Sequence, residues 1–376
     1  MKNSKYDWGV LIFIVGYHLA LLIGLPIYFM NHSPSAGICV VSALLMYISG
    51  ISVTAGYHRL YSHSTYKTNK YVEAVLLFFA TIATQGSALK WACDHRKHHA
   101  YVDRDQDPYS IKKGFLFAHI LWMFYKADPI DPKVVADLYK NKLVMFQHKF
   151  YVPLMFLTNI LSFVVMGYIF NDYLSAFVFV WGVRLLVLHH FTWFINSLAH
   201  TWGSKSFSQE HSAVDNYLMS IFTFGEGYHN YHHTFANDYR NGIRWYHFDP
   251  TKWLIWTLSK FKLAYGLRKV SHIRIQERIV IERRNEMIEV VKNYLSVNSA
   301  ILEEKIESTT RDILARFSDF YRLTQEYKSY KEKGQPNKDL LEELKLQIES
   351  LKKGIAEDWE AWNKLSKDIM KQAAAS

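Results

Sequence analysis

Nine of the eighteen histidines in this 376-residue chain lie in four short runs. The densest run is GEGYHNYHH, residues 225–233, whose histidines stand at positions i, i+3 and i+4. His95, His98 and His99 repeat this spacing. Residues three and four apart share one face of an α-helix, so each run can present three imidazoles to one point.

Two sparser runs complete the set. His58 and His63 are five residues apart, and His200 follows Asn196 by four. Five-residue spacing does not place two side chains on one face of a continuous α-helix. We therefore expect the helix to end near His58 and a turn to bring His63 back.

Clustered histidines indicate metal binding, because neutral imidazole is a good ligand for iron, zinc, copper and nickel. One ion takes three or four histidines, so nine indicate two metals close together. A structural zinc site normally recruits cysteine, and Cys39 and Cys93 are far apart in the sequence. We infer redox or oxygen chemistry at a pair of iron ions, although the spacing alone does not exclude zinc. The candidate ligands are His58, His63, His95, His98, His99, His200, His229, His232 and His233.

Four apolar runs are each long enough to cross a bilayer core of about 30 Å, and they are residues 8–30, 37–57, 151–170 and 174–197. The stretch 71–89 is also apolar, but a crossing there would put His95 on the opposite side of the membrane from His58. Its polar residues suit an interfacial or re-entrant helix. We expect residues 114–125 to form an amphipathic helix at the interface.

The charge pattern predicts the orientation of these spans. Residues 31–36 and 171–173, which link the spans on one side, contain no Lys or Arg, whereas the other side is rich in both. By the positive-inside rule, both termini and all four histidine runs are cytoplasmic. The net charge of +10 then suits an anionic membrane face, and no nucleic-acid partner is expected. We predict an all-α multi-pass membrane protein with four transmembrane helices and a cytoplasmic helical cap around a dimetal site.

The composition changes after about residue 268, which divides the chain into a membrane domain, 1–268, and a charged helical extension, 269–376. Apolar residues at heptad spacing from Leu341 to Ile369 predict a helical hairpin or short coiled coil, with a break at Gly334–Asn337. Such an extension could pack on the membrane domain, self-associate, bind a partner or remain a solvated appendage.

In chain order, the motifs HxxxxH, HxxHH, Asn-x-x-x-His and HNYHH resemble those of membrane fatty acyl desaturases of the stearoyl-CoA desaturase type. The resemblance covers about residues 8–265, and its motifs are residues 56–59, 94–99, 107–108, 196–197 and 225–235. It implies that the histidines hold two ferrous ions, that Asn196 reaches one of them through a water, and that O₂ is the co-substrate. The expected reaction introduces a cis double bond, at the Δ9 position, into a long-chain acyl-CoA.

The resemblance also guides the residues around the ligands. Asp94 and Glu226 adjoin the histidine runs, and we expect them to accept hydrogen bonds from ligand imidazoles. The other nearby carboxylates are Asp103, Asp105, Asp107 and Asp238. No His-Pro-Gly-Gly haem motif occurs in the sequence, so we expect a separate electron donor: a ferredoxin, a rubredoxin or a cytochrome b5-like protein on the basic cytoplasmic face.

The substrate head group is where the chain departs from the pattern. Many acyl-CoA members read Trp-Ala-Arg-Asp before the second histidine run, whereas Trp91 here begins Trp-Ala-Cys-Asp. The candidate substrate-binding residues are the aromatic side chain of Trp91 and the cations of Lys90, Lys112 and Lys113. Residues 85–91 are closer to bacterial members, which suggests a bacterial inner membrane.

Two other readings stay open. A membrane fatty acyl hydroxylase or an acyl-lipid desaturase would use the same metal chemistry with a different product or substrate. A membrane metal transporter or sensor is less favoured, because transporters place their polar ligands at the midplane of crossing helices.

Overall fold

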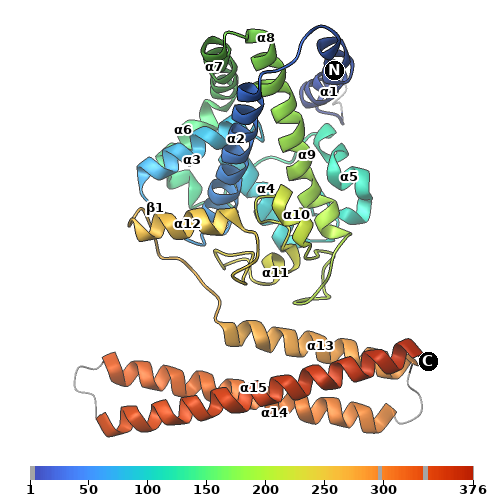
Figure 1. Cartoon of the computed structure of the whole chain (residues 1–376), viewed down its shortest axis with the longest axis vertical. Helices are drawn as coiled ribbons and strands as arrows, with labels where there is room; N and C mark the ends of the chain where they lie inside the picture. Colours follow the sequence, from blue (N-terminus) through green and yellow to red (C-terminus); the bar gives the residue numbers. More distant parts are fainter. Residues whose placement is uncertain (1–4, 295–298, 333–337, 376) are drawn as a thin grey trace. The chain divides into compact units, whose positions relative to one another are not determined.

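The computed structural model describes residues 5–294, 299–332 and 338–375, and its regular structure is almost entirely helical (Figure 1). Internal contacts divide the chain into two units. The first contains Met1–Lys205 and Glu210–Lys269, and the second contains Ser206–Gln209 and Val270–Ser376. No sequence pattern predicts that the segment 206–209 belongs with the C-terminal unit.

Four helices of the first unit are long and apolar enough to cross a membrane, which confirms the four expected spans. Their residues are Trp8–Asn31, Ala36–Ser62, Tyr151–Phe170 and Tyr173–His200. The first and third are α1 and α7, while the second is α2 (Ala36–Ser52) continued by η1 (Val53–Ser62). The fourth combines α8 (Tyr173–Ser175), η5 (Ala176–Val183), α9 (Arg184–Asn196) and η6 (Leu198–His200). This fourth span contacts the other three, and it runs beside α2 in Figure 1.

The apolar stretch 71–89 is not a span, as expected. Helix α3 (Lys70–Ile82) has only 13 residues, about 20 Å of helix. A turn follows in which Thr84 and Gly86 have positive φ. Two neighbouring helices accept hydrogen bonds from this turn: the Gly86 backbone amide donates to the Tyr151 hydroxyl over 2.8 Å, and the Gln85 side-chain amide donates to the Thr192 hydroxyl over 2.8 Å. Helix α4 (Ala88–Tyr101) then begins with the Ser87 hydroxyl as its N-terminal cap.

The expectation that a helix ends near His58 is wrong. The second span continues to Ser62 in wide π-helical turns, and the amide of His63 donates to the carbonyl of His58 over 3.1 Å. A hydrogen bond from residue i+5 to residue i widens the turn, so residues five apart share a face. The two rings consequently lie 4.8 Å apart between centroids without any intervening turn.

The expected amphipathic helix over 114–125 is broken into short pieces. These are α5 (Phe115–His119) and η3 (Leu121–Phe124), and Ile120 between them has φ of −140°. The remaining elements of this unit are η2 (Ile111–Lys113), η4 (Leu138–Lys140), α6 (Lys142–Lys149), α10 (Tyr217–Phe222), α11 (His229–Thr234), α12 (Pro250–Lys260) and the antiparallel strand pair β1 (Lys67–Thr68) with β2 (Ala264–Tyr265).

The second unit is a bundle of three helices, each contacting the other two. They are α13 (His272–Tyr294), α14 (Ser299–Glu332) and α15 (Lys338–Ala375). The heptad positions of α15 face inward, and Trp362 and Ile369 are almost fully buried in the bundle core. The helical extension is therefore present, with one helix more than the expected hairpin. The predicted break at Gly334–Asn337 lies outside the described residues.

Candidate metal centre

The four histidine runs, although distant in the sequence, meet in the first unit. Helix η1 carries His58 and is followed directly by His63, η6 ends on His200, and α4 and α11 supply three histidines each. One nitrogen from each residue lies within 4.8 Å of the others in two groups: His58, His63, His95, His99 and His232 in the first, and His98, His200, His229 and His233 in the second. The two groups are called the five-histidine group and the four-histidine group.

The two groups are immediate neighbours. Consecutive residues His98 and His99 of α4 belong to different groups, as do His232 and His233 of α11. The rings of His99 and His233 stack across the boundary with centroids 4.2 Å apart. Each i, i+3, i+4 run therefore supplies ligands to both groups, and not to a single point as the spacing predicted.

The donor atoms have a spacing that suits metal ions. In the five-histidine group, the Nε2 atom of His232 lies 3.0 Å from the Nε2 atoms of both His58 and His99. In the four-histidine group, the Nε2 atom of His229 lies 3.1 Å from those of His200 and His233. Two nitrogens at right angles around one ion, each about 2.1 Å from it, lie about 3.0 Å apart. Both groups therefore fit a transition metal.

Burial favours the neutral form of six of these imidazoles. Desolvation, followed by repulsion from the neighbouring imidazoles, lowers the pKa well below the ordinary value of 6.5 for His63, His95, His99, His229, His232 and His233. A neutral imidazole offers one lone pair to a metal, whereas a protonated one offers none. These six imidazoles can therefore ligate a metal at neutral pH.

A buried ion cluster supports the five-histidine group. The Glu226 carboxylate lies 3.0 Å from Nδ1 of His58, and the Arg59 guanidinium donates to both Glu226 and Asp249 over 3.0 Å. Burial alone would raise the pKa of Glu226, but the attraction of His58 and Arg59 outweighs it and holds that pKa below its ordinary value. Glu226 therefore stays charged beside Nδ1 of His58.

Two other carboxylates support the four-histidine group. Asp107 is buried and lies 2.9 Å from Nδ1 of His98. Asp103 accepts the hydroxyl of Ser212 over 2.5 Å, and that hydroxyl lies 2.7 Å from Nδ1 of His200. The sequence had identified both carboxylates as neighbours without a role, and it gave no signal for Ser212, which stands outside every motif.

For three other described residues predicted from the sequence, the structure shows no hydrogen bond to a histidine of either group. Asp94 accepts Lys90 Nζ over 2.6 Å, and the role predicted for it toward a histidine stays a prediction. Asn196 is the half-buried last residue of α9, and its contact with a metal through water also stays a prediction. The Trp91 indole stacks on His95 with centroids 4.8 Å apart, so it lies against the five-histidine group.

The two remaining candidate cations are solvent-exposed. Lys113 donates to the carbonyl of Asp105 over 3.3 Å, and Lys112 is exposed beside it. One histidine that the sequence did not single out, His211, lies with its ring centroid 5.3 Å from that of His233. It belongs to no repeated spacing, which is why the pattern of runs missed it.

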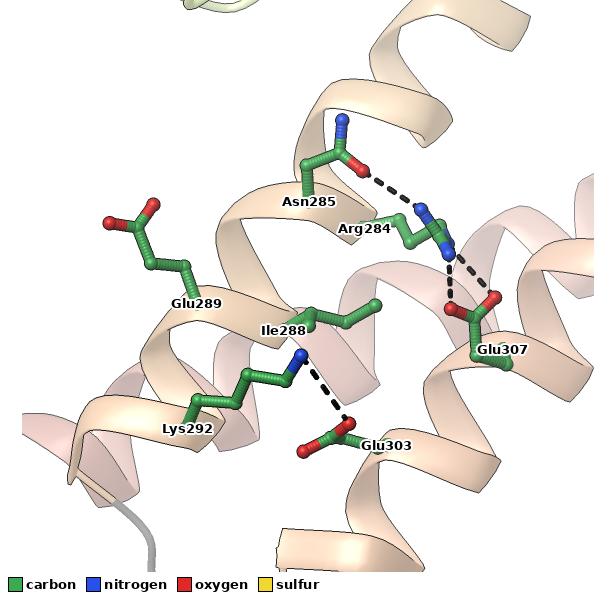
Figure 2. A pocket seen from close by; sticks show the side chains of 7 residues that line it. All are labelled: Arg284, Asn285, Ile288, Glu289, Lys292, Glu303 and Glu307. Atoms are coloured by element: carbon green, nitrogen blue, oxygen red, sulfur yellow. Dashed lines mark hydrogen bonds and ion pairs between the residues drawn. The ribbon is translucent and has the colours of Figure 1, made fainter.

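The three-helix unit has an open cavity of about 390 Å³ between α13 and α14. Figure 2 shows two ion pairs in its lining: Arg284 donates to Glu307, and Lys292 lies 3.9 Å from Glu303. This cavity contains no histidine, so the metal-binding chemistry of the described residues resides in the first unit.

Comparisons with known proteins point to the same chemistry. A family model described as fatty acid desaturase matches residues 33–268. Similar proteins include a probable acyl-CoA desaturase of Schizosaccharomyces pombe, 41% identical over 71% of this chain and 57% of that protein, and acyl-CoA desaturase 1 of Saccharomyces cerevisiae, 35% identical over 73% and 53%. Stearoyl-CoA desaturase of Sus scrofa is 34% identical over 73% of this chain and 78% of its own length.

The chain spans only slightly more than half of the two fungal relatives. The relatives named above come from fungi and a mammal, so they give no support to the expectation of a bacterial-like member. The matched region includes every histidine of both groups and three of the four apolar spans in full. By these matches and by its paired histidine groups, the chain belongs to the fatty acid desaturase family.

Proposed function

We propose that this protein is a membrane acyl-CoA desaturase that introduces a cis double bond, at the Δ9 position, into a long-chain saturated acyl-CoA. The observation that carries the proposal is the pair of adjacent five- and four-histidine groups in a chain with four apolar spans. Relatives named acyl-CoA desaturase and stearoyl-CoA desaturase support the substrate class. Two hydrogens from the acyl chain, two external electrons and two protons together reduce O₂ to two waters.

We propose iron as the metal, with one ion in each group. When bound, the two ferrous ions would activate O₂, which is the oxidant that an unactivated C–H bond requires. His58, His63, His95, His99 and His232 would hold one ion, and His98, His200, His229 and His233 would hold the other. We assign the water-mediated contact of Asn196 to the four-histidine group, because Asn196 precedes its member His200 by four residues.

The protein's own side chains orient the ligands and the substrate in this proposal. Glu226 and Asp107 lie within 3.0 Å of the Nδ1 atoms of His58 and His98, where they would accept the Nδ1 protons and leave the Nε2 lone pairs for metal. The apolar face of Trp91 would line the path of the acyl chain, because it already stacks on His95.

A CoA head group would be held at the surface. Lys112 and Lys113 are exposed cations, available for its phosphates. Lys90 would have to give up its ion pair with Asp94 to contribute. The sidedness of Lys and Arg supports a site facing the cytoplasm, where a separate ferredoxin, rubredoxin or cytochrome b5-like donor would dock.

Expression in an auxotroph for unsaturated fatty acids tests the activity. We expect growth without supplement and a cis-monounsaturated fatty acid whose double bond maps to carbon 9. A variant with His232→Ala, which removes a ligand of the five-histidine group, should abolish both the product and the binding of iron at two ions per chain. An oxygenated product would instead identify a hydroxylase.

The purified enzyme tests the substrate class. Acyl-CoA, acyl carrier protein thioester and phospholipid, each carrying the same stearoyl chain, would be offered side by side with a reconstituted electron donor. We expect acyl-CoA to be converted at the highest kcat/KM. Preference for the phospholipid would identify an acyl-lipid desaturase with the same metal chemistry.

A further inference from the structure

A short relay connects Asp103 with His200. The loop after α4 carries Asp103, and the segment after η6 carries Ser212. We propose that Asp103 and Ser212 are positioning residues that fix the tautomer and ring orientation of His200, so that the four-histidine group binds its metal. This inference rests on the proposed metal centre, and it assigns roles to two residues without a place in the sequence motifs.

The direction of the hydrogen bonds determines the tautomer. A hydroxyl has a single proton, and a carboxylate only accepts. The Ser212 proton therefore goes to Asp103 Oδ1, 2.5 Å away. The hydroxyl oxygen must then accept from Nδ1 of His200, 2.7 Å away. His200 consequently carries its proton on Nδ1, and its Nε2 lone pair faces Nε2 of His229, 3.1 Å away.

The backbone conformation at Asp103 and its hydrogen bonds hold the carboxylate against Ser212. Asp103 has φ of +63°, a left-handed conformation that is uncommon for residues other than glycine. Its own amide donates to Asp107 Oδ2 over 3.3 Å, while its carboxylate also accepts the Ser212 amide over 2.6 Å. One loop thus serves two ligands of the same group, His98 directly through Asp107 and His200 through Ser212.

The two bonds between Asp103 and Ser212 can be separated experimentally. The bond from the Ser212 amide joins the two segments, and any side chain at this position preserves it. Only the hydroxyl continues the relay to His200. Ser212→Ala therefore removes the relay while it retains the backbone anchor, and Ser212→Thr retains both. Asp103→Asn keeps the size of the side chain but removes the charge, and Asp105→Asn changes an exposed carboxylate of the same loop.

The test measures binding of ⁵⁷Fe(II) to the full-length, metal-depleted protein in detergent, by metal analysis and Mössbauer spectroscopy. Loss of a residue that orients a ligand imidazole typically lowers metal affinity about 10- to 100-fold. We expect this loss for one of two ions in Ser212→Ala and Asp103→Asn, with the spectrum of the other ion unchanged. Ser212→Thr and Asp105→Asn should bind like the wild type.

The outcomes separate the two claims. Wild-type affinity for both ions in Ser212→Ala would overturn the relay while leaving the metal centre intact. Equal weakening of both ions would also overturn it, because the relay reaches one group only. A wild-type protein that binds fewer than two ions would overturn the proposed function itself, and the relay with it.

Discussion

Three imidazoles illustrate how single residues prepare the site. The Nδ1 atoms of His58, His98 and His200 each lie within 3.0 Å of an oxygen that can accept a proton. An imidazole that donates from Nδ1 keeps its lone pair on Nε2, the atom by which His58 and His200 approach other histidines of their groups. Hydrogen bonds made before a metal arrives therefore set the geometry of the donors.

The same burial that frees the lone pairs makes the metal-free protein sensitive to acid. Six group members outside the apolar spans have a pKa well below 6.5 when folded, whereas the unfolded chain has ordinary histidines. Between these values the unfolded state binds more protons, so the stabilisation is full above about pH 6.5 and is lost as the pH falls below it. Thermal unfolding of the chelator-treated protein should show a falling midpoint from about pH 7 to about pH 5. A constant midpoint would contradict the prediction.

Glu226→Gln tests the carboxylate that both His58 and Arg59 contact. The change removes one partner of a buried ion cluster, which typically costs about 3–5 kcal/mol. We expect a lower unfolding temperature and weaker metal binding, measured by calorimetry and metal analysis of purified protein. Asp137→Asn is the matched control: its ion pair with Arg96 is half exposed, so the stability change should stay within about 1 kcal/mol. Comparable losses in both variants would show that Glu226 has no special role.

At the scale of elements, the wide turns of η1 matter most. They place His58 and His63 on one face, which a regular α-helix would prevent. A regular α-helix has 3.6 residues per turn. No pattern in the sequence of residues 53–62 predicts the wider π-helical turns. The spans were predictable because a bilayer demands about 20 apolar residues, and the exclusion of 71–89 followed from topology. The Ser212 relay was not predictable, because it depends on a contact between residues 109 positions apart.

Gly227 shows how tightly one element is held against another. It precedes α11, and a Cβ at this position would lie 2.3 Å from the amide nitrogen of Ser220 and 2.6 Å from the carbonyl oxygen of Asn216. These are backbone atoms, so they cannot rotate away. We expect Gly227→Ala to displace His229 and to reach or exceed the usual overpacking cost of about 1–3 kcal/mol.

The readouts for this variant are the yield of monodisperse protein in detergent and its metal content. Gly16→Ala in α1 provides the control, because nothing lies within 4 Å of the added carbon. The control should match the wild type in both measurements. Full metal content in Gly227→Ala would contradict the prediction, because it would show that the added Cβ does not displace His229 from its group.

At the scale of the whole molecule, the two units have separate cores. The histidine groups belong to the first unit, and the three-helix bundle has its own apolar interior. The sequence indicated the second unit by its change of composition and the heptads of α15. It did not indicate three helices, because the charged stretch 273–331 shows no break in its helical period. The inward-facing heptads are used within the bundle, and self-association of the extension stays a prediction.

Separate cores predict separate effects of mutation. Trp362 is 1% exposed in the bundle core, and truncation of such a residue typically costs about 3–5 kcal/mol. Trp362→Ala in the full chain should therefore lower the unfolding temperature of the bundle and leave iron content and desaturase activity at wild-type levels. Leu346→Ala, at a 63% exposed position of the same helix, should change stability by less than about 0.5 kcal/mol. Loss of iron in Trp362→Ala alone would show that the metal centre depends on the bundle, and the two units would then fold as one.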